Sequence, residues 1–386
     1  MWHSRGWRRI GAAVLMLVGV VAVGGVTPSG ADHADCALRY VAGGDAVVWG
    51  KDAKDPGNDE NLRYSHQLLE DTGRLDANGP WCEYNTSREE ATTTDTFVSE
   101  ATYLNNTLSQ QAAAWEREPR LITLTLGRQN DTIVKHITDC FKNVKDHDFL
   151  DANACALQVL APGGHWDKLK LDLTTILNTF MIQQDGNPQL IVAVTGYFNP
   201  FPSATDVATK IPGFCAKLVD TIPTCIARWV LLPPALITLD QVVQKLNTTI
   251  EEVVTQFEEA SQGRFVFVNP YEKFKSHCMD MKVQIKTTVY HPTNTTHDHD
   301  TQETNFGCSD TWIGSDDKEG NKSPFLYLTP AVTGVLILAT QTTKEMGVNP
   351  NKHGHDCISD LVYEAVKNKL DIPEAPAPND VCKGDS

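Results

Sequence analysis

Residues 190–196 read LIVAVTG, and this stretch decides the class of fold. Five consecutive apolar residues fit a strand that is buried on both faces, as strands are in a parallel sheet covered by helices. Residues 121–126 (LITLTL) and 264–269 (RFVFVN) are predicted to be further strands, and residues 39–48 hold a short apolar run that ends in Gly and Asp. The chain therefore has the strands expected of an α/β protein.

Helical patterns lie between and after these strands. Apolar residues recur at helical spacing in residues 166–181, 240–263 and 356–370, and residues 61–73 form a shorter helix closed by a glycine. Strands that alternate with helices imply βαβ units and a parallel sheet. We therefore predict a single three-layer α/β/α sandwich around a short parallel sheet.

The first 31 residues have the features of a secretory signal peptide. Arginines precede an apolar run at residues 10–26, and small residues follow it. The alternative is an uncleaved membrane anchor, which the short, glycine-containing run disfavours. We expect a mature, secreted domain over residues 32–371, with an irregular polar insertion at 282–322 and a Pro-rich tail at 372–386.

The ten cysteines all follow the predicted signal peptide. An even number in an exported chain argues for disulfides, and the absence of a CxxC pair argues against a zinc cluster. They are Cys36, Cys82, Cys140, Cys155, Cys215, Cys225, Cys278, Cys308, Cys357 and Cys382.

The chain carries a formal net charge of −16. Such a surface repels nucleic acid and anionic lipid headgroups, so neither is an expected partner. No stretch beyond the predicted signal peptide is long and apolar enough to span a bilayer. We expect a monomer without a cofactor.

Five further stretches follow one another in an informative order: 40–50 (YVAGGDAVVWG), 121–131 (LITLTLGRQND), 194–202 (VTGYFNPFP), 265–278 (FVFVNPYEKFKSHC) and 348–366 (VNPNKHGHDCISDLVYEAV). In this order they resemble the sequence blocks of the SGNH (GDSL) hydrolases, especially the secreted actinobacterial esterases and lipases. The resemblance extends over about residues 36–370. It implies a sheet of about five parallel strands in flavodoxin-like order.

The resemblance also implies two disulfides, Cys36–Cys82 and Cys140–Cys155. Three further pairs, Cys215–Cys225, Cys278–Cys308 and Cys357–Cys382, are proposed only because their members are close in sequence.

The resemblance places two parts of a catalytic site near the first and third strands. The Gly-Asp-Ser signature of the family corresponds to Gly44, Asp45 and Ala46, so a methyl group stands where the family has its nucleophilic hydroxyl. Asp45 has a structural alternative as a cap of the following turn. Gly127 and Asn130 fit the third block, apart from one extra residue between them, and Asn130 is the candidate oxyanion donor.

The last block lacks the catalytic base. Asn349 stands where the family has its histidine, and its carboxamide does not take up a proton near neutral pH. Met346 occupies the position of the acid, with Glu345 beside it. His353 and His355 are possible substitute bases, although the favoured interpretation is a surface loop residue and a non-catalytic family position. Either histidine would still lack a nucleophile.

A second cluster lies in the predicted insertion, where His297 and His299 alternate with aspartates. These are possible metal ligands, but two ligands in a polar loop favour a solvated segment instead.

The sequence thus leaves two functional hypotheses. The first is a secreted SGNH-type protein with little or no ester hydrolysis that keeps a pocket for an ester, acyl or carbohydrate ligand. The second is an active carboxylic-ester hydrolase or acyltransferase with relocated catalytic residues. The sequence does not decide whether the chain is an enzyme.

Overall fold

A computed structural model describes most of the chain after residue 148 and shorter parts before it. The described residues are 38–44, 47, 64–69, 81–85, 119–126, 140, 143, 149–216, 229–279, 282–290, 296–298, 302–308, 312–327, 336–370 and 382. The chain divides into residues 1–35 and 36–386. All described residues belong to the second unit, so the predicted signal peptide lies outside them.

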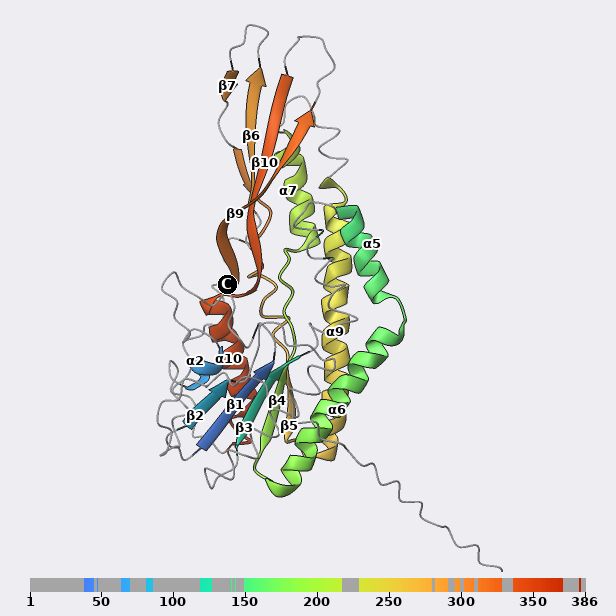
Figure 1. Ribbon diagram of the computed structural model, residues 1–386, viewed down its shortest axis with the longest axis vertical. Helices are drawn as coiled ribbons and strands as arrows, with labels where there is room; N and C mark the ends of the chain where they lie inside the picture. The colour runs from blue at the N-terminus through green and yellow to red at the C-terminus, as the bar shows by residue number, and fades with distance from the viewer. Residues whose placement is uncertain are drawn as a thin grey trace, which may run out of the picture. The chain divides into compact units, whose positions relative to one another are not determined.

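The second unit contains a five-stranded parallel sheet (Figure 1). Its strands are β2 (Trp81–Asn85), β1 (Leu38–Gly44), β3 (Leu121–Thr125), β4 (Ile191–Thr195) and β5 (Phe265–Val268), in the order β2-β1-β3-β4-β5. Every neighbouring pair is parallel. This is the flavodoxin-like order, so the predicted fold class is confirmed. Strands β3 and β4 are buried along their whole length, as their apolar sequences predicted.

In the described part of the chain, one helical layer contains α5 (Phe149–Leu160), α6 (Gly164–Gly186), α7 (Ala204–Ala216) and α9 (Leu232–Ala260). Helix α9 contacts β5 as well as the other three helices of this layer. It begins eight residues before the predicted start at residue 240. Its first turn holds prolines, and the first turn of a helix tolerates them because its backbone N–H groups have no partner within the helix.

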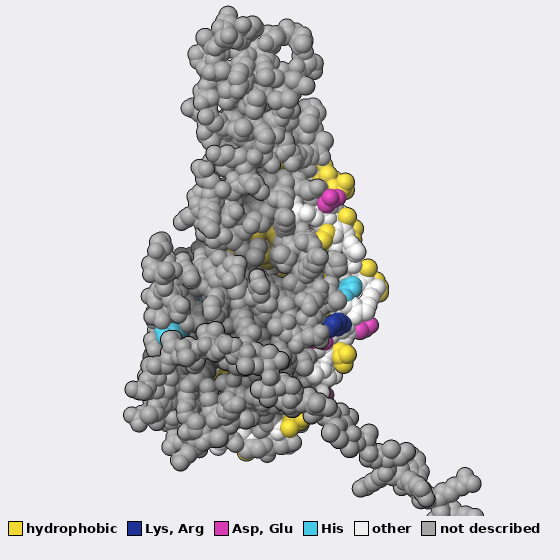
Figure 2. Space-filling view, viewed as in Figure 1, with side chains coloured by type: hydrophobic (Ala, Val, Ile, Leu, Met, Phe, Trp, Pro, Cys, Tyr) yellow, Lys and Arg dark blue, Asp and Glu magenta, His cyan; other side chains and the backbone are white. Residues whose placement is uncertain are grey.

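The exposed apolar side chains on these described helices are Leu150 and Leu157 of α5, Leu171 and Ile182 of α6, and Ile237 of α9. Hydrophobic side chains on the visible face lie scattered among polar ones (Figure 2), which is normal for a protein surface. None of the described helices has the length and apolar composition to cross a membrane.

Two helices that are far apart in sequence pack against each other, namely α2 (Tyr64–Leu69) and α10 (Lys352–Val366). Helix α10 also contacts β4 and β5. Asn351 caps α10 by accepting a hydrogen bond from the backbone of Gly354 at 3.1 Å. A Cβ atom on Gly354 would lie 2.5 Å from the backbone oxygen of Trp312, so this close approach requires glycine.

The prediction of an irregular insertion at 282–322 is wrong, because this segment contributes to an antiparallel sheet. The strands are β6 (Lys282–Tyr290), β7 (Thr296–Asp298), β8 (Gln302–Asn305), β9 (Ile313–Tyr327) and β10 (Leu336–Pro350). Their order is β7-β6-β10-β9, and β8 also pairs with β6. The polar composition suggested loops. Strand β6 instead pairs with β10, which comes later in the chain, and its Thr and Val residues suit a strand.

The segments that connect the antiparallel sheet to the rest of the fold, before β6, before β9 and after β10, are joined by hydrogen bonds. Met279 donates to Pro200 O at 2.8 Å, Trp312 donates to His277 O at 3.0 Å, and Asn351 donates to Trp312 O at 2.8 Å. The rings of His277 and Trp312 stack with centroids 3.6 Å apart. These connecting segments are therefore held by backbone hydrogen bonds and one aromatic stack.

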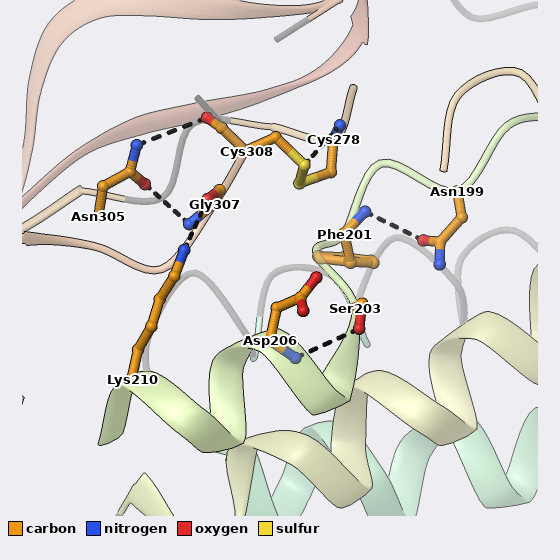
Figure 3. The surroundings of a disulfide bond; sticks show 9 residues. All are labelled: Asn199, Phe201, Ser203, Asp206, Lys210, Cys278, Asn305, Gly307 and Cys308. Carbon is orange, nitrogen blue, oxygen red and sulfur yellow. Dashed lines mark hydrogen bonds between the residues drawn. A yellow bond between two sulfur atoms is a disulfide. The ribbon is translucent and has the colours of Figure 1, made fainter. Parts of the chain in front are cut away.

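Three of the five proposed disulfides are confirmed: Cys140–Cys155, Cys278–Cys308 and Cys357–Cys382. Figure 3 shows the second of these beside α7, where Lys210 donates to Gly307 O at 3.2 Å. Cys215 is also disulfide-bonded, but its proposed partner Cys225 lies outside the described residues. Cys36 lies outside them as well, so the pairs Cys36–Cys82 and Cys215–Cys225 stay predictions.

Candidate functional site at the carboxyl edge of the sheet

The two strands that precede the predicted catalytic segments lie side by side. Gly44, the last residue of β1, pairs with Thr125, the last residue of β3. Gly44 has a φ of 138°, a conformation that favours glycine. Strand order reverses between β1 and β3, and α/β sheets bind their ligands at the carboxyl edge of such a switch point. Asp45, Ala46, Gly127 and Asn130 follow these strands directly, outside the described residues.

The predicted histidine position lies at the end of the antiparallel sheet. Asn349 is the next-to-last residue of β10, and Glu345 belongs to the same strand. Strand β10 leads through the cap residue Asn351 into α10. The metal candidate His297 belongs to β7, and His299 lies outside the described residues.

The two candidate substitute bases differ completely in their surroundings. His355 is 0% exposed, and its Nδ1 accepts a hydrogen bond from the backbone N–H of Tyr64 at 3.2 Å. Its ring also stacks on the Tyr64 ring. His353, in contrast, is exposed in the first turn of α10. His355 thus joins α10 to α2 from inside the core, where a base does not meet substrate.

A chain of buried hydroxyl groups runs beneath α2. Tyr40 and Thr123 share a hydrogen bond of 2.7 Å, and the Tyr64 hydroxyl lies 3.3 Å from both Thr123 Oγ1 and Thr125 Oγ1. Thr125 is bonded in turn to Thr195 of β4. Thr123 and Thr125 share one face of β3 because side chains alternate along a strand. These groups satisfy one another, so they stabilise the core.

A cavity of about 420 Å³ lies farther along the same edge of the sheet, where β4 and β5 end. This volume falls in the range of roughly 300–1,000 Å³ that is typical of small-molecule sites. The lining residues come from the segment after β4, from α9 and from the segment after β5: Asn199, Phe201, Pro202, Ser203, Ala204, Leu236, Ile237, Asp240, Gln241, Gln244, Tyr271 and Lys275.

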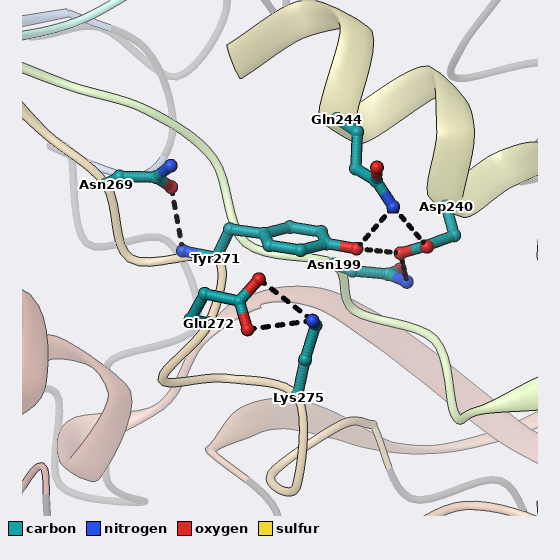
Figure 4. A network of polar contacts seen from close by, with 7 residues as sticks. All are labelled: Asn199, Asp240, Gln244, Asn269, Tyr271, Glu272 and Lys275. Carbon is teal, nitrogen blue, oxygen red and sulfur yellow. Dashed lines mark hydrogen bonds and ion pairs between the residues drawn. The ribbon is translucent and has the colours of Figure 1, made fainter. Parts of the chain in front are cut away.

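Asp240 is the centre of a polar network in this cavity (Figure 4). Its Oδ1 accepts hydrogen bonds from Asn199 Nδ2 at 2.7 Å and from the Tyr271 hydroxyl at 2.6 Å. Its Oδ2 accepts one from Gln244 Nε2 at 2.7 Å, and the same nitrogen donates to the Tyr271 hydroxyl at 2.8 Å. All of these donors are neutral, so none of them balances the negative charge of the Asp240 carboxylate.

The network keeps the Tyr271 phenol protonated. Burial is the main cause that raises the pKa of Tyr271 above its ordinary value near 10, and the hydrogen bond to Asp240 adds to it. The ammonium group of Lys275 lies 5.1 Å from the centre of the Tyr271 ring and is also paired with Glu272 at 2.7 Å. The phenol therefore serves as a hydrogen-bond donor and does not supply a phenolate.

The cavity was missed by the sequence-based prediction, although a repeated pattern precedes it. An Asn-Pro-aromatic run could have marked it, since residues 199–201 (NPF) follow β4 and residues 269–271 (NPY) follow β5. Asn199 Oδ1 accepts from the backbone of Phe201, and Asn269 Oδ1 accepts from the backbone of Tyr271, each at 3.0 Å. The same kind of asparagine turn thus follows both strands and orients the residues after it.

The loop after β4 is also fixed from below by α9. Asn247 Oδ1 accepts from the backbone N–H of Tyr197 at 2.7 Å, and Asn247 Nδ2 donates to the Tyr197 carbonyl at 2.7 Å. A Cβ atom on Gly196 would lie 2.7 Å from Asn247 Oδ1, so glycine is needed for this approach. This pair of bonds seats the loop that carries Asn199 and Phe201.

No family model matches the chain, and no curated protein sequence matches it. Solved structures are similar to it at low identity. An extracellular lipase from Streptomyces rimosus is 14% identical with a TM-score of 0.42, over 86% of this chain and 100% of that one. Phospholipase A1 from Streptomyces albidoflavus NA297 is 15% identical (TM-score 0.41; 86% and 99% covered). The M. smegmatis aryl esterase is 11% identical (0.38; 86% and 100%). In its strand order and in the order of its sequence blocks, the chain resembles the SGNH (GDSL) hydrolases.

Proposed function

We propose that this chain is an exported protein with an SGNH hydrolase-like fold that binds an ester, acyl or carbohydrate ligand and performs little or no ester hydrolysis. One observation carries the proposal. Ala46 follows the end of β1 by two residues, where the family has its serine, and Asn349 stands where the family has its histidine. The segment at the switch point therefore carries a methyl group in place of a nucleophile.

The chemistry of acyl transfer explains why these two positions matter. A hydroxyl oxygen must attack the carbonyl carbon while a neighbouring base removes its proton. Alanine has no oxygen to attack with, and the carboxamide of asparagine is not basic near neutral pH. Loss of both groups removes the nucleophile and its activation together.

The described residues offer little to replace them. Every cysteine whose side chain is described is in a disulfide, so no thiolate nucleophile is available there. His355 is committed to the contact with Tyr64 inside the core. The alternative function, ester hydrolysis or acyl transfer by relocated residues, is favoured only by His353, which lies four residues after Asn349 and is exposed.

Hydrolysis of p-nitrophenyl acetate, butyrate and decanoate tests the proposal. The unmodified protein is expected to release p-nitrophenol no faster than buffer. An Ala46→Ser, Asn349→His variant is expected to gain rate over an Ala46→Ser, Asn349→Gln control, which has the hydroxyl without the base. A complete triad is worth roughly 10⁶-fold in a well-formed hydrolase, so even a poorly placed pair gives a measurable gain.

The results separate the two functions. Turnover by the unmodified protein would overturn the proposal, and labelling by a fluorophosphonate probe would then identify the relocated nucleophile. A folded double variant that stays at the control rate would count against the assignment of positions 46 and 349 as partners.

A further inference from the structure

We propose that the cavity around Asp240 binds a neutral, hydroxyl-rich ring such as one pyranose unit of an oligosaccharide. The inference rests on the proposed function because it chooses one ligand class for a chain that does not hydrolyse esters. The site that it uses is built by the segments after β4 and β5 and by α9, not by the positions of the missing nucleophile and base.

The hydrogen-bonding groups that remain available in the cavity are of both kinds. Within the described part of the chain, the side-chain amide of Gln241 and the amide oxygen of Gln244 make no hydrogen bond. Ser203 only accepts a bond, from the backbone of Asp206 at 3.3 Å, so its hydroxyl proton is available. A ligand must therefore both donate and accept, as every sugar hydroxyl does.

Asp240 and Asn199 extend this set without giving up their own contacts. Asp240 Oδ2 accepts one hydrogen bond, from Gln244, and a carboxylate oxygen accepts about two. Asn199 Nδ2 donates one of its two protons, to Asp240. Because the network already holds these groups in place, a ligand does not have to order them, which lowers the entropic cost of binding.

Part of the cavity lining is apolar. It comprises Pro202, Ala204, Leu236 and Ile237. Leu236 is 2% exposed and forms a fixed surface, whereas Ile237 is 51% exposed. A pyranose has one face of C–H groups and an equator of hydroxyls, so its face can cover these apolar side chains while its edge bonds to the neighbouring amides. The Tyr271 ring is not available for stacking from the side that Lys275 occupies.

Two other ligand classes fit less well. An acyl chain would displace water from the unused donors and acceptors of Gln241, Gln244 and Asp240 without bonding to them, which is unfavourable for each group that it covers. An anion would approach the carboxylate of Asp240, while Lys275 is already paired with Glu272. A neutral ligand with many hydroxyls avoids both costs.

The test is binding of neutral tetrasaccharides to the full chain, measured by calorimetry with cello-, xylo-, malto-, manno- and chito-tetraose. Decanoate and tetramethylammonium serve as the acyl and cationic probes. The variants Gln241→Ala and Ile237→Ser change exposed cavity residues. Their matched controls are Gln256→Ala, on an exposed part of α9 away from the cavity, and Ile182→Ser, on exposed α6.

We expect at least one tetrasaccharide to bind with a dissociation constant at or below about 1 mM, and each cavity variant to weaken it about tenfold while the controls do not. No binding of any tetrasaccharide, binding of only decanoate or tetramethylammonium, or equal affinity in variants and controls would overturn the inference. Ester turnover would instead contradict the proposed function, so the two failures are distinguishable.

Discussion

Polar side chains gather at two places along the parallel sheet, and they are used differently. Near β1 and β3, the groups of Tyr64, Thr123, Thr125 and His355 are 0% exposed and bond inside the core. Near β4 and β5, the network around Asp240 lines a cavity and keeps donors and acceptors unused. Buried polarity alone therefore does not mark a ligand site. Spare hydrogen-bonding capacity that faces open volume is the better criterion.

The comparison predicts that the scaffold below the cavity carries more stability than the cavity itself. Asn247→Ala should have the largest effect, because it removes two hydrogen bonds to the backbone of the buried Tyr197. We expect a loss of about 4 kcal/mol in the free energy of unfolding. Urea denaturation checks this against Asn178→Ala, an exposed helical asparagine whose replacement should be neutral or slightly stabilising.

His355→Ala tests the other polar region. Removal of the buried ring leaves a cavity and takes the acceptor from the Tyr64 N–H. The expected cost is about 3 kcal/mol. His353→Ala, in the same turn but exposed, should stay within about 0.5 kcal/mol. Equal effects of the two changes on urea denaturation would remove the distinction between a core histidine and a surface one.

Tyr271→Phe probes the cavity network itself. Loss of one hydroxyl that bonds to Asp240 and Gln244 should cost about 1 kcal/mol at neutral pH. The pH dependence gives a sharper result. The pKa of Tyr271 is raised in the folded state, so the folded chain holds this proton more tightly than the unfolded chain. Its contribution is complete below the unfolded value near 10 and is lost as the pH rises above it.

The measurable consequence is a slope of stability against pH. Above about pH 10, the free energy of unfolding should fall by up to about 1.4 kcal/mol per pH unit more steeply in the unmodified chain than in Tyr271→Phe. Denaturation from pH 8 to 11 measures both slopes. Parallel curves would mean that the phenol does not titrate differently in the folded chain.

The smallest effect is expected at the rim of the cavity. Glu272 and Lys275 form an ion pair whose side chains are 70% and 55% exposed. Water screens such pairs, so Glu272→Gln should change stability by less than about 0.5 kcal/mol. A thermal-unfolding comparison at low and high salt decides this. A larger, salt-sensitive loss of stability would mean that the Glu272–Lys275 ion pair contributes measurably to the stability of the fold.

The spacing of apolar residues predicted the parallel sheet and most of the helices of the α/β fold. The apolar runs that became β3 and β4 are buried throughout, and the run that became β5 is buried except for the partly exposed Phe267. The signal of each strand lies within a few residues of sequence. The three confirmed disulfides likewise join cysteines no more than 30 residues apart.

The remaining structure depends on partners that are distant in sequence. Strand β6 has β-branched residues at alternate positions, a strand pattern that the prediction overlooked in a polar region, and its partner β10 lies some 50 residues later. The cavity draws Asn199, Asp240 and Tyr271 from three separate segments. Trp229 stacks on Phe306 and Trp312 stacks on His277, and both contacts join residues that are far apart in sequence.

The hydrogen bonds between Asn247 and the loop that joins β4 to α7 bear on glycosylation of the protein during its production. Residues 247–249 read Asn-Thr-Thr, the acceptor pattern for N-linked glycans in eukaryotic secretion. The nitrogen that would carry the glycan is Asn247 Nδ2, which is bonded to the Tyr197 carbonyl on a residue only 3% exposed. A glycan on this nitrogen does not fit the buried position that Asn247 has in the folded chain. In a glycosylating host, occupancy at Asn247 would thus report whether modification preceded folding.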